Sequence, residues 1–474
     1  MTTFYIEQFG CRATQADGAA IERQLLDRGY APAPEPASAD IVVINTCTVT
    51  AAADAQARDA IRKIHAGNPS SRVIVTGCYA QRAPEELAIL PGVAFVVGNS
   101  HKPQIPQLVS AFRNASPSSL TGDFISASAF ANDSLSLLNA PAKILTGDIF
   151  AQTEFLAAPV LGGESNHTRP TLKIQDGCNS RCSYCVIPFV RGKSRSLLPE
   201  TVLGEIRQLA ASGYREIVLS GINLGSYGRD LSPRVEFIDL LHRILDETPI
   251  ERLRISSIEP LDVTQDLIDL FASNDRLAEH FHMPLQSGSD RILAAMHRWY
   301  HAEHYARRIE LIRERFPHAA IGADVIAGFP GETEEDHAAT LAFIARLSFT
   351  YLHVFSYSSR PGTKAAALSG QIPGHIVKRR ARELRALGEA EAAAFRRLQL
   401  GRTLRVLTLR HDEEADSNTT PALSTNYLRL QVGGVHPANR WLNVQAREVK
   451  GNDLLAEEEN GEELQASKMT CANA

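Results

Sequence analysis

The sequence predicts an α/β protein in three parts: an N-terminal domain on a parallel sheet, a partial (β/α)6 barrel, and a small C-terminal β-barrel. Three observations predict this order. Strand-like and helix-like segments alternate over the first hundred residues, the alternation resumes with longer units from residue 170, and short β-like runs follow residue 401. Alternation of strands and helices is typical of parallel sheets covered by helices.

The first domain is expected at residues 1–113. The continuous apolar run IVVINT is typical of a buried parallel strand. We expect strands at 4–10, 41–46, 72–77 and 94–99, and helices at 14–27 and 51–66. Residues 114–168 are rich in Ser, Ala, Thr, Asn and Gly, which indicates a linker or insertion with room for one edge strand.

The second domain is expected at residues 169–400. Six strand-like segments, separated by helical ones, predict a partial barrel of parallel strands; they lie at 171–177, 216–224, 252–258, 280–286, 320–329 and 351–357. The helical segments are 199–212, 235–247, 263–273, 302–315 and 334–347, and a helix at 376–398 closes the domain.

The third part is expected at residues 401–460. Its β-like runs, at 403–410, 427–433 and 441–449, are separated by Gly, Asn and Pro, which predicts a small β-barrel. Residues 461–474 are expected to form an acidic, solvated tail.

Composition excludes several classes of protein. Hydrophobic residues make up 44% and charged residues 22% of the 474 residues, which is ordinary for a soluble globular chain. No apolar run approaches the ~18 residues that span a bilayer, and the N-terminus does not resemble a signal peptide. We expect a cytoplasmic protein that does not associate with a membrane. Because the net charge is −5, a nucleic-acid partner would require a local basic face.

Six of the seven cysteines form two groups of three. An odd number of cysteines in a cytosolic chain argues against a disulfide framework. Cys178, Cys182 and Cys185 follow the first strand of the second domain closely enough to hold one inorganic cluster. Iron–sulfur clusters normally have four thiolate ligands, so three leave one iron open to an amine and carboxylate. The alternative is a zinc knuckle, but no histidine or fourth cysteine lies in or just after this motif.

The second group, Cys11, Cys47 and Cys78, comes from three separate predicted strand ends. Because the carboxyl ends of parallel strands meet at one edge of a sheet, these cysteines are expected to converge. They would form a second three-thiolate cluster site. The alternative is three buried structural cysteines, although each lies in a polar turn that is a poor core site.

These motifs carry a resemblance to a known family. CNSRCSYC resembles the radical S-adenosylmethionine (SAM) signature, and EQFGCRATQAD, VINTCTVT and VTGCYAQR extend the resemblance to the methylthiotransferases. That family has an N-terminal cluster domain, a radical SAM barrel and a C-terminal TRAM domain. CVIPFVRGKSRS, RISSIEP, HMPLQSGSDRILAAMHRWY and TNYLRL are most similar to the branch that acts on tRNA N6-threonylcarbamoyladenosine.

The resemblance implies two [4Fe–4S] clusters, one on each cysteine group, and two SAM molecules per turnover. The cluster on Cys178, Cys182 and Cys185 would cleave SAM, and the one on Cys11, Cys47 and Cys78 would carry the sulfur. The implied product is a methylthio group at C2 of the modified adenosine at tRNA position 37. The implied partners are tRNA, an electron donor such as flavodoxin or ferredoxin, and a sulfur source; we expect a monomer.

Three alternatives stay open from the sequence. The substrate could be a dimethylallyl-type tRNA adenosine, or an aspartate of a ribosomal protein. In a different class, the chain could be a non-catalytic, cysteine-rich RNA-binding protein that holds zinc.

Further site residues are expected at strand ends of the second domain. Polar groups there could hold the amine, carboxylate and hydroxyl groups of SAM, although Ser, Asn and Asp also cap helices and loops. The expected SAM-binding residues are Ser220, Gly221, Asn223, Ser257, Glu259, Gln286 and Asp324.

Two basic segments could bind RNA phosphates. Arg191 and Arg195 lie beside the cysteine loop, and Lys378, Arg379 and Arg380 begin a run of eight Lys/Arg against three Glu at 378–402. The alternative is a solvated helix face. A small β-barrel directly after this run favours RNA binding, since such barrels bind single-stranded nucleic acid.

Overall fold

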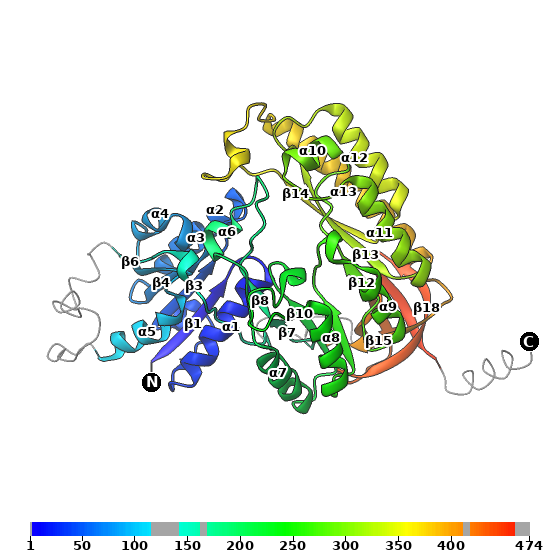
Figure 1. The fold of residues 1–474 in the computed structure, drawn as a ribbon. Helices are drawn as coiled ribbons and strands as arrows, with labels where there is room; N and C mark the ends of the chain where they lie inside the picture. Colours follow the sequence, from blue (N-terminus) through cyan, green and yellow to red (C-terminus); the bar gives the residue numbers. More distant parts are fainter. Residues whose placement is uncertain (1, 115–141, 162–167, 411–417, 460–474) are drawn as a thin grey trace, which may run out of the picture.

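The computed structural model describes residues 2–114, 142–161, 168–410 and 418–459. In Figure 1 the N-terminal domain, in blue and cyan, lies beside an arc of green and yellow strands, and the small orange and red barrel packs against that arc. The predicted acidic tail with Cys471 and most of the predicted linker lie outside the described residues. None of the described helices is long and apolar enough to cross a membrane.

The N-terminal sheet has six parallel strands in the order β2-β1-β3-β4-β5-β6. They are β1 (Thr3–Gln8), β2 (Ala31–Pro32), β3 (Ile41–Thr46), β4 (Arg72–Gly77), β5 (Val93–Gly98) and β6 (Lys143–Leu145). Apolar side chains of α1 (Arg12–Leu26) and α5 (Ile105–Asn114) cover one face. Those of α2 (Ala51–Gly67), α3 (Cys78–Arg82) and α4 (Pro84–Ala88) cover the other.

The second part confirms the expected partial barrel of six parallel strands. They are β7 (Thr171–Lys173), β10 (Glu216–Ser220), β11 (Arg252–Ile255), β12 (His280–His282), β13 (Ala320–Ala327) and β14 (Tyr351–Ser356). A parallel bridge between Leu253 of β11 and Leu277, three residues before β12, lies between its two three-stranded sheets. The helices are α7 (Pro199–Ala211), α8 (Phe237–Glu247), α9 (Gln265–Ser273), α11 (Ala302–Arg315), α12 (Glu334–Leu347) and α13 (Gly374–Arg397).

Shorter elements complete the second part. They are β8 (Gln175–Asp176), α6 (Ile187–Arg191), β9 (Arg195–Ser196) and α10 (Asp290–Ala295). The outer helices pack on one face of the arc through a large apolar core. Figure 1 shows α11, α12 and α13 on the side of β12, β13 and β14 that is turned away from the N-terminal domain. Along β13 and β14 the alternate side chains that do not join this core are partly polar, at Asp324, Tyr351 and His353, and partly apolar, at Ile326 and Phe355.

The C-terminal part is a closed barrel of five strands in the order β15-β16-β17-β19-β18. They are β15 (Thr403–Thr408), β16 (Thr419–Ser424), β17 (Arg429–Gly433), β18 (Trp441–Lys450) and β19 (Asp453–Glu458). The sequence analysis found β15, β17 and β18 but missed β16 and β19. Pro421 and the acidic residues of β19 weaken the local strand pattern, and closure of the barrel supplies the missing stabilisation.

The small barrel is docked at the amino ends of the arc strands. The turn between β16 and β17 contributes Tyr427, whose ring stacks on His280 with centroids 4.2 Å apart. The buried Arg254 guanidinium donates to the carbonyls of Ser424 at 3.2 Å and Thr425 at 3.1 Å. The small barrel therefore satisfies a buried cation of the second part, at the end opposite the cysteines.

We expect Tyr427→Ala to weaken this docking, because the ring stacks on His280 and faces the Arg254 guanidinium at 5.3 Å. The free energy of unfolding should fall by about 1–3 kcal/mol. Urea titration followed by the fluorescence of Trp441, in a Trp299→Phe background, would measure this. The control is Val435→Ala, since Val435 is 76% exposed. An unchanged urea midpoint for Tyr427→Ala would show that the stacked ring does not hold the barrel in place.

Candidate functional site

The N-terminal cysteines lie at the carboxyl ends of three adjacent strands. Cys11 follows β1 and caps α1, Cys47 directly follows β3, and Cys78 begins α3 directly after β4. Gly10 makes this close approach possible, because its φ is +112° and an added Cβ would lie 2.5 Å from the Cβ of Cys47. The expected convergence of these three residues is thus reproduced by the parallel pairing of β1, β3 and β4.

The second cysteine group lies in the loop between β8 and α6. The backbone N–H of Cys178 donates to the carbonyl of Gly192 at 3.1 Å, and that of Cys185 donates to the carbonyl of Cys182 at 3.2 Å. The Cys182 sulfur accepts a hydrogen bond from Arg298 Nη1 at 3.4 Å. All three cysteines are partly exposed and free. The loop therefore presents three thiols in a fixed arrangement.

The two cysteine groups adjoin each other. Cys78 packs against Val186 and Val190, which directly follow the second group. Asn99 Nδ2 donates to the Val190 carbonyl at 2.7 Å and contacts the Cys78 sulfur at 3.6 Å. The carboxyl edge of the N-terminal sheet therefore faces the cysteine loop of the barrel.

The spacing of the sulfur atoms argues against a single zinc ion in either group. Zinc bonds sulfur at about 2.3 Å, so its ligand sulfurs lie at most about 4.6 Å apart. Among the described residues, the one group whose ligand atoms all lie within 4.8 Å is His282, Asp324 and His353, and neither cysteine group meets that limit. Burial raises the pKa of the Cys47 and Cys185 thiols to about 12. Both thiols would ionise on binding a metal cluster.

Ser220, Gly221 and Asn223 lie at or just beyond the end of β10. The backbone N–H of Asn223 donates to Gln175 Oε1 at 2.8 Å, whereas its own Oδ1 is buried without a hydrogen-bond partner among the described residues. An unsatisfied buried acceptor fits a ligand that brings an N–H group.

Ser257 and Glu259 follow β11, and Glu259 pairs with Arg298, the same residue that contacts Cys182. Sequence reasoning missed Arg298 because no spacing motif marks it. The contact follows from segment 295–298 lying against the cysteine loop, where Ser183 bonds the carbonyls of Ala295 and Met296.

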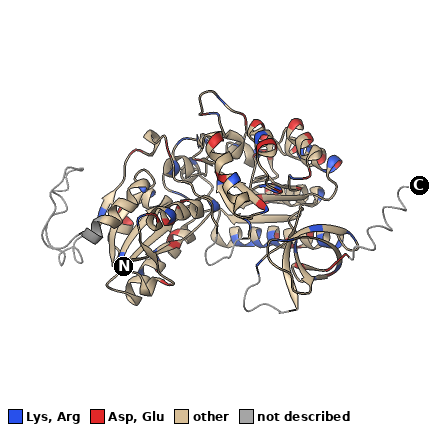
Figure 2. Ribbon diagram, turned by 90° about the horizontal axis from the view of Figure 1, so that it is seen from below, with Lys and Arg blue, Asp and Glu red and all other residues tan. Residues whose placement is uncertain are grey.

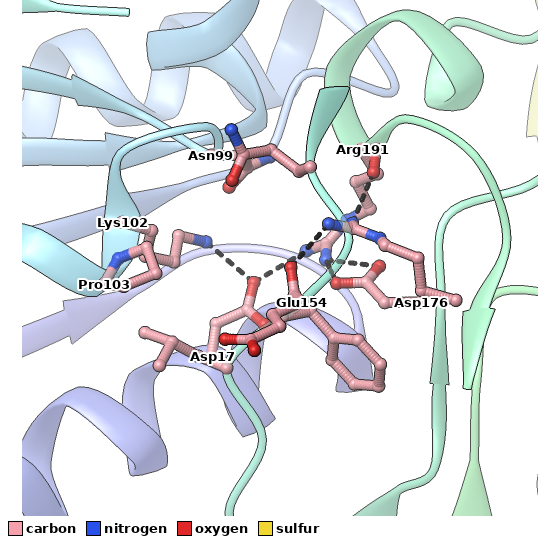
Figure 3. A pocket seen from close by; sticks show the side chains of 11 residues that line it. Asp17, Asn99, Lys102, Pro103, Glu154, Asp176 and Arg191 are labelled. Atoms are coloured by element: carbon pink, nitrogen blue, oxygen red, sulfur yellow. Dashed lines mark hydrogen bonds and ion pairs between the residues drawn. The ribbon is translucent and has the colours of Figure 1, made fainter. Parts of the chain in front are cut away.

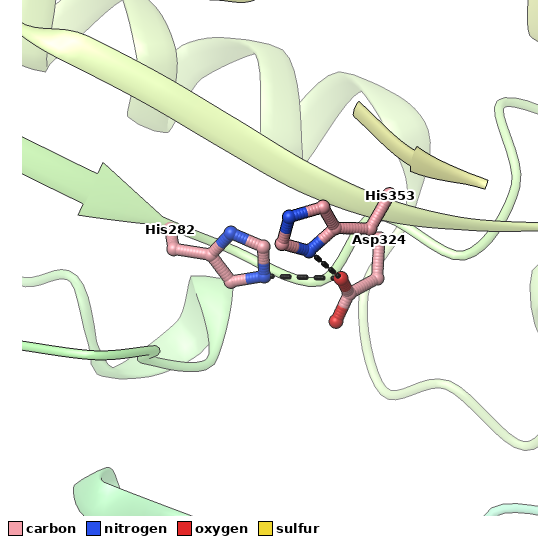
Figure 4. A group of neighbouring side chains, drawn as sticks. All are labelled: His282, Asp324 and His353. Carbon is pink, nitrogen blue, oxygen red and sulfur yellow. Dashed lines mark hydrogen bonds and ion pairs between the residues drawn. The ribbon is translucent and has the colours of Figure 1, made fainter. Parts of the chain in front are cut away.

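Gln286 and Asp324 lie on the inner side of the arc. Gln286 adopts a φ of +67°, which is costly for a residue with a side chain and is often found at functional sites. Figure 4 shows His282 and His353 both directed at Asp324. Asp324 Oδ1 lies 3.1 Å from His282 Nε2 and 3.2 Å from His353 Nδ1. The sequence analysis did not single out these two histidines.

Arg191 and Arg195 are not placed to contact RNA, contrary to expectation. Arg191 is buried between Asp17 and Asp176, with nitrogen–oxygen distances of 3.0 and 2.9 Å. The buried Arg195 donates to the carbonyls of Glu154 and Arg191. Figure 3 shows Lys102 also pointing at Asp17. The cavity here measures about 20 Å³, enough for one water molecule but not for a substrate.

Two of the three residues of α13 that were expected to bind RNA are paired with carboxylates. Arg380 is buried against Glu332 and Glu334, and Arg379 pairs with Glu334 and Glu383. Only Lys378 of the three expected RNA-binding residues of α13 is exposed without an ion pair within the described part of the chain. Figure 2 shows basic and acidic positions interleaved over all three parts of the molecule.

Comparison with known proteins agrees with this architecture. Residues 3–98 match a family described as "Uncharacterized protein family UPF0004", and residues 172–344 match the radical SAM superfamily. A threonylcarbamoyladenosine tRNA methylthiotransferase of Aquifex aeolicus is 35% identical over 92% of this chain and 98% of its own length. The Bacillus subtilis protein of the same name is 34% identical over 92% of this chain and 91% of its own.

The chain belongs to the radical SAM methylthiotransferases. A tRNA-2-methylthio-N(6)-dimethylallyladenosine synthase of Carboxydothermus hydrogenoformans is 33% identical over 81% of this chain and 82% of its own. The radical SAM methyltransferase TsrM of Kitasatospora setae shares the fold, with a TM-score of 0.54, 16% identity and 77% coverage of each chain.

Membership in this family implies a [4Fe–4S] cluster, SAM and a second cluster. The two sets of cysteines are chemically suited to hold the two clusters, because each offers three free thiols that are spaced too widely for one zinc ion. Asn223 Oδ1, which has no hydrogen-bond partner in the described part of the chain, lies just beyond the end of β10. The sequence-based identification of a radical SAM methylthiotransferase is confirmed.

We expect Cys182→Ala and Cys47→Ala to separate two activities, because the two cysteine groups belong to different domains. Cys182→Ala should abolish SAM cleavage and halve the iron content, from about eight to about four per chain. Cys47→Ala should lose a similar amount of iron but retain SAM cleavage and form no methylthio product. Iron analysis and chromatography of both products would test this. Loss of all iron in either variant would mean that the six cysteines form one site.

Proposed function

We propose that this enzyme attaches a methylthio group to C2 of N6-threonylcarbamoyladenosine at position 37 of tRNA, next to the anticodon. In this proposal Cys178, Cys182 and Cys185 hold the cluster that binds SAM, and Cys11, Cys47 and Cys78 hold the second cluster. The first cluster would supply the electron that cleaves SAM. The chain's own residues orient these groups and the adenosine.

The observation that carries the choice of adenosine is the polar inner face of the arc. Relatives named for threonylcarbamoyladenosine and for dimethylallyladenosine are 35% and 33% identical to this chain, so identity alone does not distinguish them. The inner face carries His282, Asp324, Tyr351 and His353, and Tyr351 occupies the space that a side chain at Gly322 would fill. These side chains already bond one another, Tyr351 with His282 and Asp324 with both His282 and His353. A hydrocarbon dimethylallyl group would add no hydrogen-bond partner to this network, whereas the amide, hydroxyl and carboxylate of a threonylcarbamoyl group would.

Arg12 adds a cation that suits the threonyl carboxylate. It directly follows Cys11, is half-buried, and has no hydrogen bond or ion pair with any part of the chain that the structure describes. Burial lowers the pKa of His280 well below its usual value, and positive charges including that of Arg12 lower it further. Arg12 thus counts among the charges that act on His280, and its guanidinium could bind a carboxylate in bidentate fashion.

Mass spectrometry of tRNA nucleosides from a strain that lacks this protein tests the proposal. We expect the methylthio derivative of N6-threonylcarbamoyladenosine to disappear and its unmethylthiolated form to accumulate. Loss of a methylthio dimethylallyladenosine instead would contradict the choice of adenosine. Unchanged tRNA with an unmodified ribosomal-protein aspartate would contradict the choice of tRNA.

We expect Arg12→Gln to lower kcat/KM with tRNA by about 10- to 100-fold, because a hydrogen bond to a charged group contributes roughly 1.5–3 kcal/mol. SAM cleavage without tRNA and iron content should stay unchanged. Arg28→Gln is the matched control, since Arg28 lies exposed beyond the other end of α1. An unchanged kcat/KM in Arg12→Gln would exclude Arg12 as the carboxylate-binding residue.

A further inference from the structure

Two groups of buried polar side chains join the N-terminal domain to the partial barrel. The first includes Asp17 on the helix that follows Cys11, and the second includes Thr48, which directly follows Cys47. We call them the first clamp, formed by Asp17, Lys102, Lys173, Asp176 and Arg191, and the second clamp, formed by Thr48, Asp54, Arg82 and Arg360.

The first clamp connects the segment after Cys11 with both ends of the barrel's cysteine loop. Asp17 lies on α1, which begins directly after Cys11, and accepts from Arg191 Nη2 at 3.0 Å. Arg191 Nη1 donates to Asp176, two residues before Cys178, at 2.9 Å. Although burial alone would raise the pKa of Asp17, the surrounding cations hold it well below its usual value. Asp17 is therefore a buried carboxylate anchored to the barrel.

The second clamp connects the segment after Cys47 with the loop that follows β14. Thr48 directly follows Cys47 and its Oγ1 donates to Asp54 Oδ1 at 2.6 Å. Arg360 Nη1 donates to Asp54 Oδ2 at 2.6 Å and to the Thr48 carbonyl at 3.3 Å. Arg82 Nη2 reaches the same carboxylate oxygen at 3.1 Å. One guanidinium of the barrel thus holds both the turn after Cys47 and helix α2.

Stability alone does not account for these contacts. Buried ion pairs contribute little more than well-packed apolar side chains, because desolvation offsets the attraction between the charges. A buried ion pair tolerates less displacement than an apolar contact does, because a buried charge left without its partner is strongly destabilising. Each clamp therefore permits one register between the two domains. Arg191 of the first clamp contacts Thr14, three residues after Cys11, at 3.5 Å, and Arg360 of the second contacts Thr48, directly after Cys47, at 3.3 Å.

We propose that Arg191 and Arg360 are positioning residues that hold the N-terminal cysteine group at a fixed distance and orientation from Cys178, Cys182 and Cys185. The inference rests on the family's use of both groups and not on the identity of the substrate RNA. Its consequence is that methylthio transfer needs both clamps, whereas SAM cleavage does not need the second clamp.

The test compares Arg360→Met and Arg360→Lys with the wild-type full chain carrying both clusters. The readout is the ratio of 5′-deoxyadenosine to methylthio product. We expect this ratio to rise about tenfold or more in Arg360→Met, because a displacement of about 1 Å can slow a reaction by about 10²-fold. Arg360→Lys, which keeps the charge, should recover part of the coupling. The control is Arg207→Met, since Arg207 forms an exposed pair with Glu247.

A second measurement does not require the iron–sulfur clusters to be bound. Hydrogen exchange of the iron-free protein should become faster at the amides of residues 47–54 in Arg360→Met, and at residues 12–17 and 176–178 in Arg191→Lys. A general loss of stability would lower both products in proportion and leave their ratio unchanged. An unchanged ratio together with unchanged exchange at residues 47–54 would overturn the proposal.

Discussion

Parallel strand pairing is the constraint on which the site depends. In β1, β3 and β4 the chain runs in one direction, so the residues after each strand emerge at the same edge, and Cys11, Cys47 and Cys78 meet there. The same rule places the barrel's cysteine loop, Ser220 and Glu259 at the carboxyl ends of their strands. The site forms where these two edges face each other, with Cys78 packed against Val186 and Val190.

Charge is distributed unevenly around this junction. Cations and carboxylates are buried and paired at its sides, through Asp17 with Arg191 and Asp54 with Arg360. Arg12, in contrast, has no hydrogen bond or ion pair among the described residues. In our proposal the paired charges hold the domains together, and the unpaired Arg12 binds the carboxylate of the substrate. This division explains why Arg191, which the sequence marks only as basic, is not available to RNA.

The small C-terminal barrel has a structural role in addition to the RNA-binding role expected of it. Its Tyr427 covers His280, and its Ser424 and Thr425 carbonyls satisfy Arg254. Without these contacts, a buried guanidinium at the amino end of the arc would lose two acceptors. The barrel thus completes the second domain at the end opposite the cysteines.

The sequence by itself determined the three-part α/β architecture, the family and the two groups of cysteines. Apolar periodicity specifies strands and helices locally, and the spacing of Cys178, Cys182 and Cys185 is a local property of the chain. The sequence did not identify β16, β19, Arg298 or the His282–Asp324–His353 group. It also did not distinguish buried arginines from exposed ones. Lys102, for example, meets Asp17 across 85 residues of sequence. The tertiary structure decided these features, because the partner of a charged side chain depends on which segments pack together and not on its neighbours along the chain.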